Sequence, residues 1–206
     1  MIGSVAASTL SLIFGIIYLK HVRDYLVPVF LLSLLGCAVD IISLIITESG
    51  RNNWYIFHFY TLLEFTLWIT FYFLFLKRYY GTYYWLFLQV PALAIVCIID
   101  YKNNGIDSMD SLSVSLECLT LSLLSLLSFL FLLRKGIVSE LVRTPFFYAN
   151  TAVLIYFLGD LFFFTFSDYI RSAETSSYMA LWTIHSLMNI TSNLLLCAAF
   201  KKAVAI

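Results

Sequence analysis

The sequence predicts an all-α membrane protein, a polytopic bundle of seven transmembrane helices with its N-terminus outside and its C-terminus in the cytoplasm. Composition is the first observation: of the 206 residues, 62% are hydrophobic and only 12% are charged, whereas soluble domains are nearer one quarter charged. The second is a run of seven apolar stretches, each close to the roughly 20 residues that a helix needs to cross a bilayer. The third is the placement of the basic residues in the gaps between them.

The basic residues alternate between a crowded set of gaps and a sparse one. Because cytoplasmic loops retain Lys and Arg during insertion, the crowded set is predicted to be cytoplasmic. It comprises Lys20, Arg23, Lys77, Arg78, Arg134, Lys135, Arg143, Lys201 and Lys202, against Arg51, Lys102 and Arg171 in the other. The predicted location is the plasma membrane, which is the inner membrane in a Gram-negative bacterium.

The chain reads as a single transmembrane domain, 1–206. Its first span has no basic residue before it, so we expect an uncleaved helix and not a signal peptide. Prolines open the second and sixth spans, Pro28 and Pro145, as they often open helices. The predicted spans are residues 2–19, 26–46, 54–76, 83–99, 112–133, 145–167 and 177–200.

Aromatic residues mark the start of the third, fourth and seventh spans, because amphipathic rings prefer the headgroup layer. These residues are Trp54, Tyr55, Tyr83, Tyr84, Trp85, Tyr178 and Trp182. The fifth span follows the only long polar loop, residues 100–111, which is predicted to lie outside.

The first three and the last three spans share features that indicate two parallel three-helix units joined by the fourth, one known transporter architecture. Spans one and five carry rows of small residues, and spans two and six each contain an aspartate, Asp40 and Asp160. In spans three and seven, a tryptophan shortly precedes a histidine. Chance similarity between Leu- and Phe-rich helices is the alternative.

Six ionisable residues fall within the spans, where an ionised side chain costs roughly 2.5–3.5 kcal/mol at mid-helix. In the predicted orientation all of them lie between the midplane and the outer surface, which predicts one polar cavity open to the outside. Asn189 belongs to a polar stripe on the last span. The candidate ligand- or proton-binding residues are Asp40, His58, Glu64, Glu117, Asp160, His185 and Asn189. The alternative is hydrogen bonding between packed helices.

The favoured function is binding or transport of a small polar or cationic solute, with proton coupling through Glu64 and His185. One alternative is an intramembrane metal-dependent hydrolase acting on a lipid headgroup, with His58, His185, Asp160 and Glu117 as metal ligands. Another is a membrane sensor or accessory subunit with a membrane or cytoplasmic protein partner. No catalytic residue or cofactor is assigned, and an enzyme is the less favoured class. A net charge of zero and the absence of a dense basic cluster argue against a nucleic-acid partner.

Three familiar seven-span classes do not fit the residues. A retinal-binding opsin needs a lysine inside a span, and no span has one. Ceramidase-type zinc amidases use three histidines, whereas two lie in the spans here. Sugar transporters with three-one-three repeats carry Pro-Gln pairs, which are absent. In its general layout the chain resembles small uncharacterised seven-span bacterial membrane proteins, a resemblance that implies no activity and transfers no residue roles.

Overall fold

The computed structural model describes residues 2–22, 24–81, 83–105, 111–134, 142–165 and 175–205. Every regular element in these residues is helical, which confirms the all-α prediction. The described α-helices are α1 (Ile2–Ile17), α2 (Leu26–Glu48), α3 (Trp54–Tyr80), α4 (Gln89–Asn104), α5 (Ser111–Arg134), α7 (Pro145–Thr165) and α9 (Thr175–Lys202). Short 3-10 helices cover Leu19–His21, Tyr84–Leu88 and Ala203–Ala205.

Six helical segments of the described chain are long and apolar enough to cross a membrane, and one of them, Tyr84–Asn104, combines α4 with the 3-10 helix before it. The shorter α1 is not among them. The fold is therefore that of a multi-pass membrane protein. The first helix is apolar but has only 16 residues, about 24 Å at a rise of 1.5 Å per residue, against a hydrocarbon core about 30 Å thick. The count of seven spans stays a prediction.

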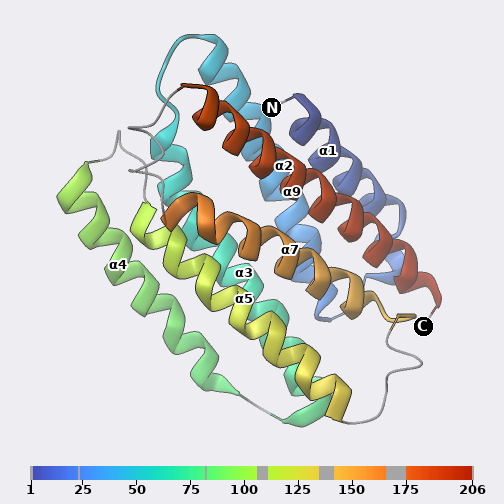
Figure 1. Cartoon of the computed structure of the whole chain (residues 1–206). Coiled ribbons are helices and arrows are strands. Elements are labelled where there is room, and N and C mark those ends of the chain that lie inside the picture. Colours follow the sequence, from blue (N-terminus) through green and yellow to red (C-terminus); the bar gives the residue numbers. More distant parts are fainter. Residues whose placement is uncertain are drawn as a thin grey trace.

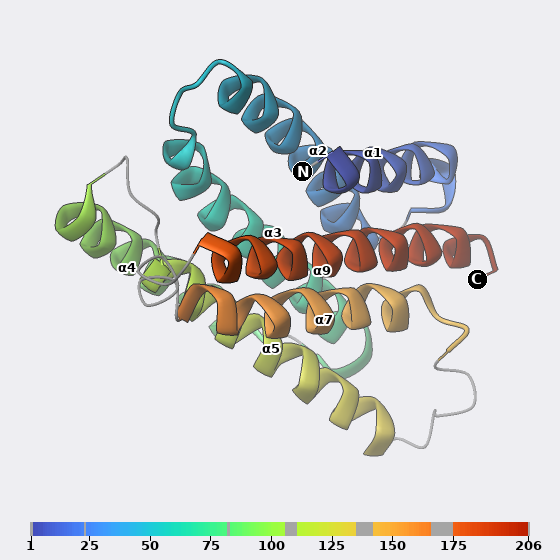
Figure 2. The same ribbon diagram turned by 45° about the horizontal axis from the view of Figure 1, so that its top comes forward.

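The helices pack as a closed ring. Helices α1, α2 and α3 contact one another in chain order, as do α5, α7 and α9, and the last helix packs against the first. Helix α3 also contacts α5 directly, so α4 lies outside the ring against these two helices, at the edge of the bundle (Figures 1 and 2).

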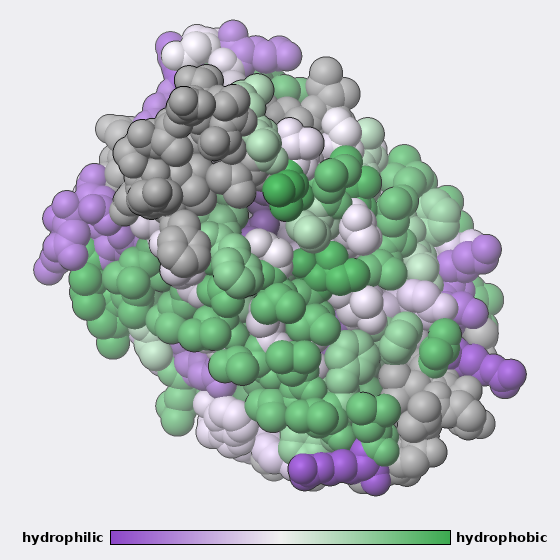
Figure 3. Space-filling view, viewed as in Figure 1, coloured by the Kyte–Doolittle hydropathy of each residue, from purple (hydrophilic) through white to green (hydrophobic). Residues whose placement is uncertain are grey.

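Successive described helices reverse direction, so their ends lie alternately at the two ends of the bundle (Figure 1). Apolar residues cover the middle of the face in Figure 3, and hydrophilic residues lie towards its margins. Arg23, Lys135 and Arg171 lie outside the described residues. Which end faces the cytoplasm stays a prediction.

Helix α5 buries its small polar residues and exposes its leucines. Ser122 and Ser125 are 2% and 0% exposed, whereas Leu123 and Leu130 are each 51% exposed. A soluble protein would show the opposite pattern, with the leucines buried and the serines exposed. In a bilayer, leucine faces lipid that is as apolar as itself, and small residues let the helix backbones approach closely.

Hydrogen bonds and aromatic packing join α3, α5 and α7 in the half of the bundle that contains the end of α3. The Tyr72 hydroxyl donates to Asn150 Oδ1 at 2.8 Å, and Asn150 Nδ2 donates to the Ser125 carbonyl at 3.1 Å. The Phe71 and Phe146 rings stack beside this network with centroids 5.3 Å apart. This packing fills the interior of the bundle in that half.

The predicted outer loop at residues 100–111 is wrong in its first part, because α4 continues to Asn104. Asp100 explains the extension. It is 1% exposed and accepts hydrogen bonds from Asn104 Nδ2 at 2.6 Å, from the Ser113 amide at 3.1 Å and from the Ser113 hydroxyl at 3.0 Å. The carboxylate therefore satisfies an amide in the first turn of α5 and ties α4 to that helix. Residues 106–110 of the loop lie outside the described residues.

Candidate functional site

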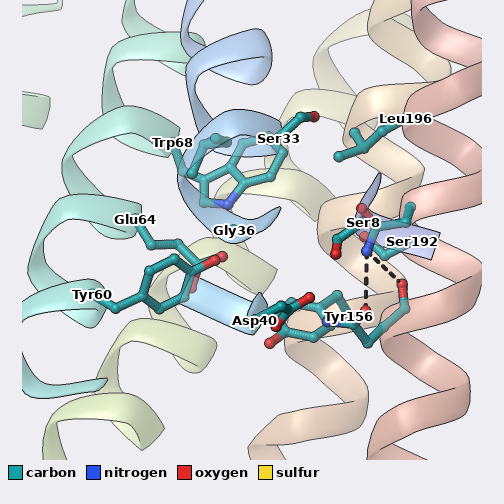
Figure 4. A pocket seen from close by; sticks show the side chains of 13 residues that line it. Ser8, Ser33, Gly36, Asp40, Tyr60, Glu64, Trp68, Tyr156, Ser192 and Leu196 are labelled. Carbon is teal, nitrogen blue, oxygen red and sulfur yellow. Dashed lines mark hydrogen bonds between the residues drawn. The ribbon is translucent and has the colours of Figure 1, made fainter. Parts of the chain in front are cut away.

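A cavity of about 60 Å³ lies inside the ring, between side chains of α1, α2, α3, α7 and α9 (Figure 4). One water needs about 10–15 Å³ of such space, so several waters or one small solute would fit. The lining residues are Ser8, Leu32, Ser33, Gly36, Asp40, Tyr60, Glu64, Trp68, Tyr156, Asn189, Ser192, Asn193 and Leu196.

Two carboxyl groups from different helices form the acidic part of the wall. Asp40 on α2 is hydrogen-bonded to the Ser8 hydroxyl of α1. Glu64 on α3 is 8% exposed and accepts a hydrogen bond from the Tyr60 hydroxyl. Tyr60, Glu64 and Trp68 share one face of α3 because residues four positions apart stack along a helix.

Amide and hydroxyl side chains of α9 form another part of the wall. Asn189, Ser192 and Asn193 recur at helical spacing and line the cavity. The polar stripe predicted for this helix also includes His185 and Ser186, which are not among the lining residues. Asn193 Nδ2 donates to both the carbonyl and the side-chain oxygen of Asn189, each at 3.0 Å. This pair of bonds fixes the Asn193 amide group and leaves its side-chain oxygen as an acceptor.

Trp68 is a lining residue that sequence reasoning missed. It is 4% exposed, and its ring packs in T-shaped contacts against Phe71 and Phe157 at centroid distances of 5.5 and 6.4 Å. The indole N–H faces the Glu64 carboxyl and interacts with it. Tyr60 and Tyr156 were missed too. For Tyr60 and Trp68, the available signal was their spacing of four residues on either side of Glu64.

Asp160 and His185 form a second polar group beside the cavity. Asp160 Oδ1 lies 2.8 Å from His185 Nδ1, and Asp160 is 1% exposed. Aromatic rings surround the imidazole: the Trp182 centroid is 5.4 Å away, that of Phe163 5.7 Å and that of Tyr156 6.0 Å. Tyr156 also lines the cavity, so it is adjacent to both polar groups.

The structure places the predicted site residues in three situations. Asp40, Glu64 and Asn189 line the cavity, and Asp160 and His185 pair beside it. Asp160 interacts electrostatically with Glu64, and His185 does so with Asp40, which links the two groups.

The remaining two candidates stand apart from the cavity wall. Glu117 on α5 is 2% exposed and interacts electrostatically with Tyr60. His58 is half-buried near the start of α3 and is not among the lining residues. The roles of all seven candidates in binding a ligand or a proton stay predictions.

The four residues named for the alternative metal site do not form a metal site within the described part of the chain. Among the residues that the structure describes, no three His, Cys, Asp or Glu side chains are grouped so as to hold a metal ion. Of the four residues named for that role, His185 and Asp160 are in direct contact, and His58 and Glu117 do not complete a ligand set with them.

Among the described residues, acidic side chains outnumber basic ones inside the bundle. Asp40, Glu64, Glu117 and Asp160 face or flank the same region, with His185 as their nearby base. The lysines and arginines of α3, α4, α5 and α9 all lie in the last turns of those helices. In a medium of low dielectric an excess of carboxylates must be neutralised by protons, by hydration or by a bound cation.

Comparisons with protein-family models, with curated proteins and with solved structures gave no match for this chain.

Proposed function

We propose that this protein is an integral membrane protein of the plasma membrane that binds a small polar or cationic solute in the cavity between α1, α2, α3, α7 and α9. The observation that carries the proposal is the placement of Asp40 and Glu64 on the wall of a cavity inside an apolar bundle. A positively charged group between the two carboxylates would offset the free-energy cost of burying their negative charges. A role in helix packing alone would not require ionisable side chains.

In this proposal the bundle crosses the membrane seven times, with its N-terminus outside and the cavity reached from the outer side. Helix α1 counts as a span because it lies within the ring, between α2 and α9. Its Ser8 and Ser11 are 3% and 0% exposed. Proton coupling would use Glu64 and the Asp160–His185 pair, which would release a proton to water when a cation binds close to them.

Binding of ethylammonium to the purified protein in lipid nanodiscs tests the proposal. Removing one carboxylate from a buried charge pair costs about 2–5 kcal/mol, so Glu64→Gln and Asp40→Asn should each weaken ethylammonium binding at least about 30-fold. Glu48→Gln is the matched control, because Glu48 is exposed at the end of α2. Titration calorimetry gives the dissociation constants.

Gly36→Ala tests the cavity by volume. A Cβ at Gly36 would lie 3.6 Å from the Tyr60 hydroxyl, an ordinary contact, so the methyl group would occupy cavity space without a clash. Because alanine also favours a helix over glycine by about 1 kcal/mol, the variant should unfold no more easily than the wild type while binding ethylammonium more weakly. Absence of ethylammonium binding to the wild type, or equal binding by Glu64→Gln and Glu48→Gln, would contradict the proposal.

A further inference from the structure

One side-chain amide on the cavity wall has its orientation fixed by its own helix. Asn193 Nδ2 donates to the backbone carbonyl and to the side-chain oxygen of Asn189, each at 3.0 Å (dashed lines in Figure 4). Because a backbone carbonyl can only accept a hydrogen bond, the end of the amide that faces it must be the NH₂ group. The other end is therefore the oxygen, an uncharged acceptor on a residue that lines the cavity.

The hydroxyl groups of the wall are less restricted in what they can bind. The Ser33 hydroxyl is hydrogen-bonded to that of Ser11 at 3.0 Å. The hydroxyls of Ser192 and Tyr156 also line the cavity, and a hydroxyl can either donate or accept. The amide oxygen of Asn193 can only accept, so it selects a donor on the ligand.

This oxygen joins the two carboxyl groups of the cavity as a third acceptor. Asp40, Glu64 and Asn193 come from α2, α3 and α9, three different helices of the ring. A volume of about 60 Å³ holds only a few heavy atoms, so one small ion can meet all three side chains. Three acceptors match a primary ammonium group, which has three N–H donors and no acceptor.

We infer that the solute is a small primary ammonium ion, whose three N–H groups donate to Asp40, Glu64 and the side-chain oxygen of Asn193. The inference rests on the proposed function, since it names the class of cation that the same cavity binds. The rings of Tyr60 and Trp68 also line the cavity, and aromatic rings alone would favour a quaternary ammonium group. The two modes of recognition therefore predict opposite preferences.

Two isomeric ions separate these modes in the wild-type protein in lipid nanodiscs. Ethylammonium and dimethylammonium have the same charge and the same heavy atoms, but the first has three N–H donors and the second has two. A hydrogen bond to a charged group is worth about tenfold or more in affinity, so ethylammonium should bind about tenfold more tightly. Without a third acceptor on the wall, dimethylammonium would bind at least as well, because it has one N–H fewer to remove from water.

Asn193→Leu assigns the third contact to the amide oxygen. Leucine has a similar size but no acceptor, so this variant should lose the preference for ethylammonium, chiefly through weaker binding of that ion. Thr191→Val is the matched control, because Thr191 is exposed on the same helix and is not among the lining residues. Residues two positions apart on a helix point to different sides. The control should keep the wild-type preference.

The possible results separate this inference from the proposed function. Equal affinities of the wild type for the two isomers, or tighter binding of dimethylammonium, would overturn the inference and leave the proposed function standing. A preference for ethylammonium that persists in Asn193→Leu would overturn the role of Asn193. If neither ion binds to the wild type, both the inference and the proposed function fail. The wild-type comparison decides the class of ion even if Asn193→Leu does not fold.

Discussion

The contact between Asp160 and His185 is the shortest link between an acid and a base in the interior of the described bundle. Asp160 is 1% exposed and the imidazole is enclosed by aromatic rings, so little water screens the pair. Such a pair is costly to break from one side, because removal of either partner strands the other in a low-dielectric environment.

A double-mutant cycle with Asp160→Asn and His185→Gln should therefore show coupling of about 1–3 kcal/mol in the free energy of unfolding. Unfolding in mixed detergent micelles, followed by circular dichroism, provides the measurement. The Asp24–Arg78 pair is the comparison: it is 3.3 Å long but its side chains are 68% and 44% exposed, so its cycle should give coupling close to zero. Additive effects at Asp160 and His185 would contradict the prediction.

At this scale the sequence identified the acidic residues better than the aromatic ones. Asp40 and Glu64 were found because a carboxyl inside an apolar span stands out by its energetic cost. Trp68 and Tyr156 did not stand out, since large aromatic residues are also ordinary core and interface residues. Their place on the cavity wall depends on which helix faces meet, and periodicity within one helix does not determine that.

At the scale of the elements, helix positions follow from local chemistry, and their ends follow from contacts between helices. The starts of α2, α3 and α7 agree with the predicted residues 26, 54 and 145, where prolines or aromatic residues mark the boundary. The end of α4 differs, because the Asp100 carboxylate is satisfied by Ser113 of the next helix. A run of polar residues therefore predicts a loop only where its side chains make no hydrogen bonds to an adjacent helix.

Asp100→Asn should destabilise the junction of α4 and α5. The substitution replaces one acceptor oxygen with a donor that faces Ser113 or Asn104, so the free energy of unfolding should fall by about 1–3 kcal/mol. Ethylammonium binding should be unchanged at temperatures where the protein is folded, because Asp100 is not among the cavity-lining residues. Asp24→Asn, on an exposed residue, should change the unfolding free energy by less than about 0.5 kcal/mol. Equal stability of the two variants would show that Asp100 does not cap α5.

At the scale of the whole molecule, the reversal of successive helices places most described basic residues at one end of the bundle. That end carries Lys20, Lys77, Arg78, Arg134, Arg143, Lys201 and Lys202, and the opposite end carries Arg51 and Lys102. The alternation was readable from the sequence because it needs only the order of spans and gaps. The closed ring could not be predicted from the sequence. It depends on the contact between α1 and α9, which lie at opposite ends of the sequence and have similar apolar compositions.

Thiol labelling on intact cells tests the proposed orientation. In a variant whose four cysteines, Cys37, Cys97, Cys118 and Cys197, are replaced by alanine, Asn103→Cys should react with a membrane-impermeant maleimide added outside. Val142→Cys, which is 52% exposed at the other end, should react only after the membrane is permeabilised. The reverse pattern would place the N-terminus in the cytoplasm and the acidic half of the cavity towards the inner surface.

The closure of the ring by its first and last helices has a consequence for biosynthesis. Ribosomes deliver α1, α2 and α3 long before α9, so Asp40 and Glu64 enter the bilayer before Asn189 and Asn193 exist. Until the last helix arrives, the wall of the cavity is incomplete, and the two carboxyls must be accommodated by protons, water or the insertion machinery. In the proposed function, binding competence would therefore appear in a single late step, when α9 fills the gap between α1 and α7, and a nascent chain that stops short of α9 would have no complete cavity wall.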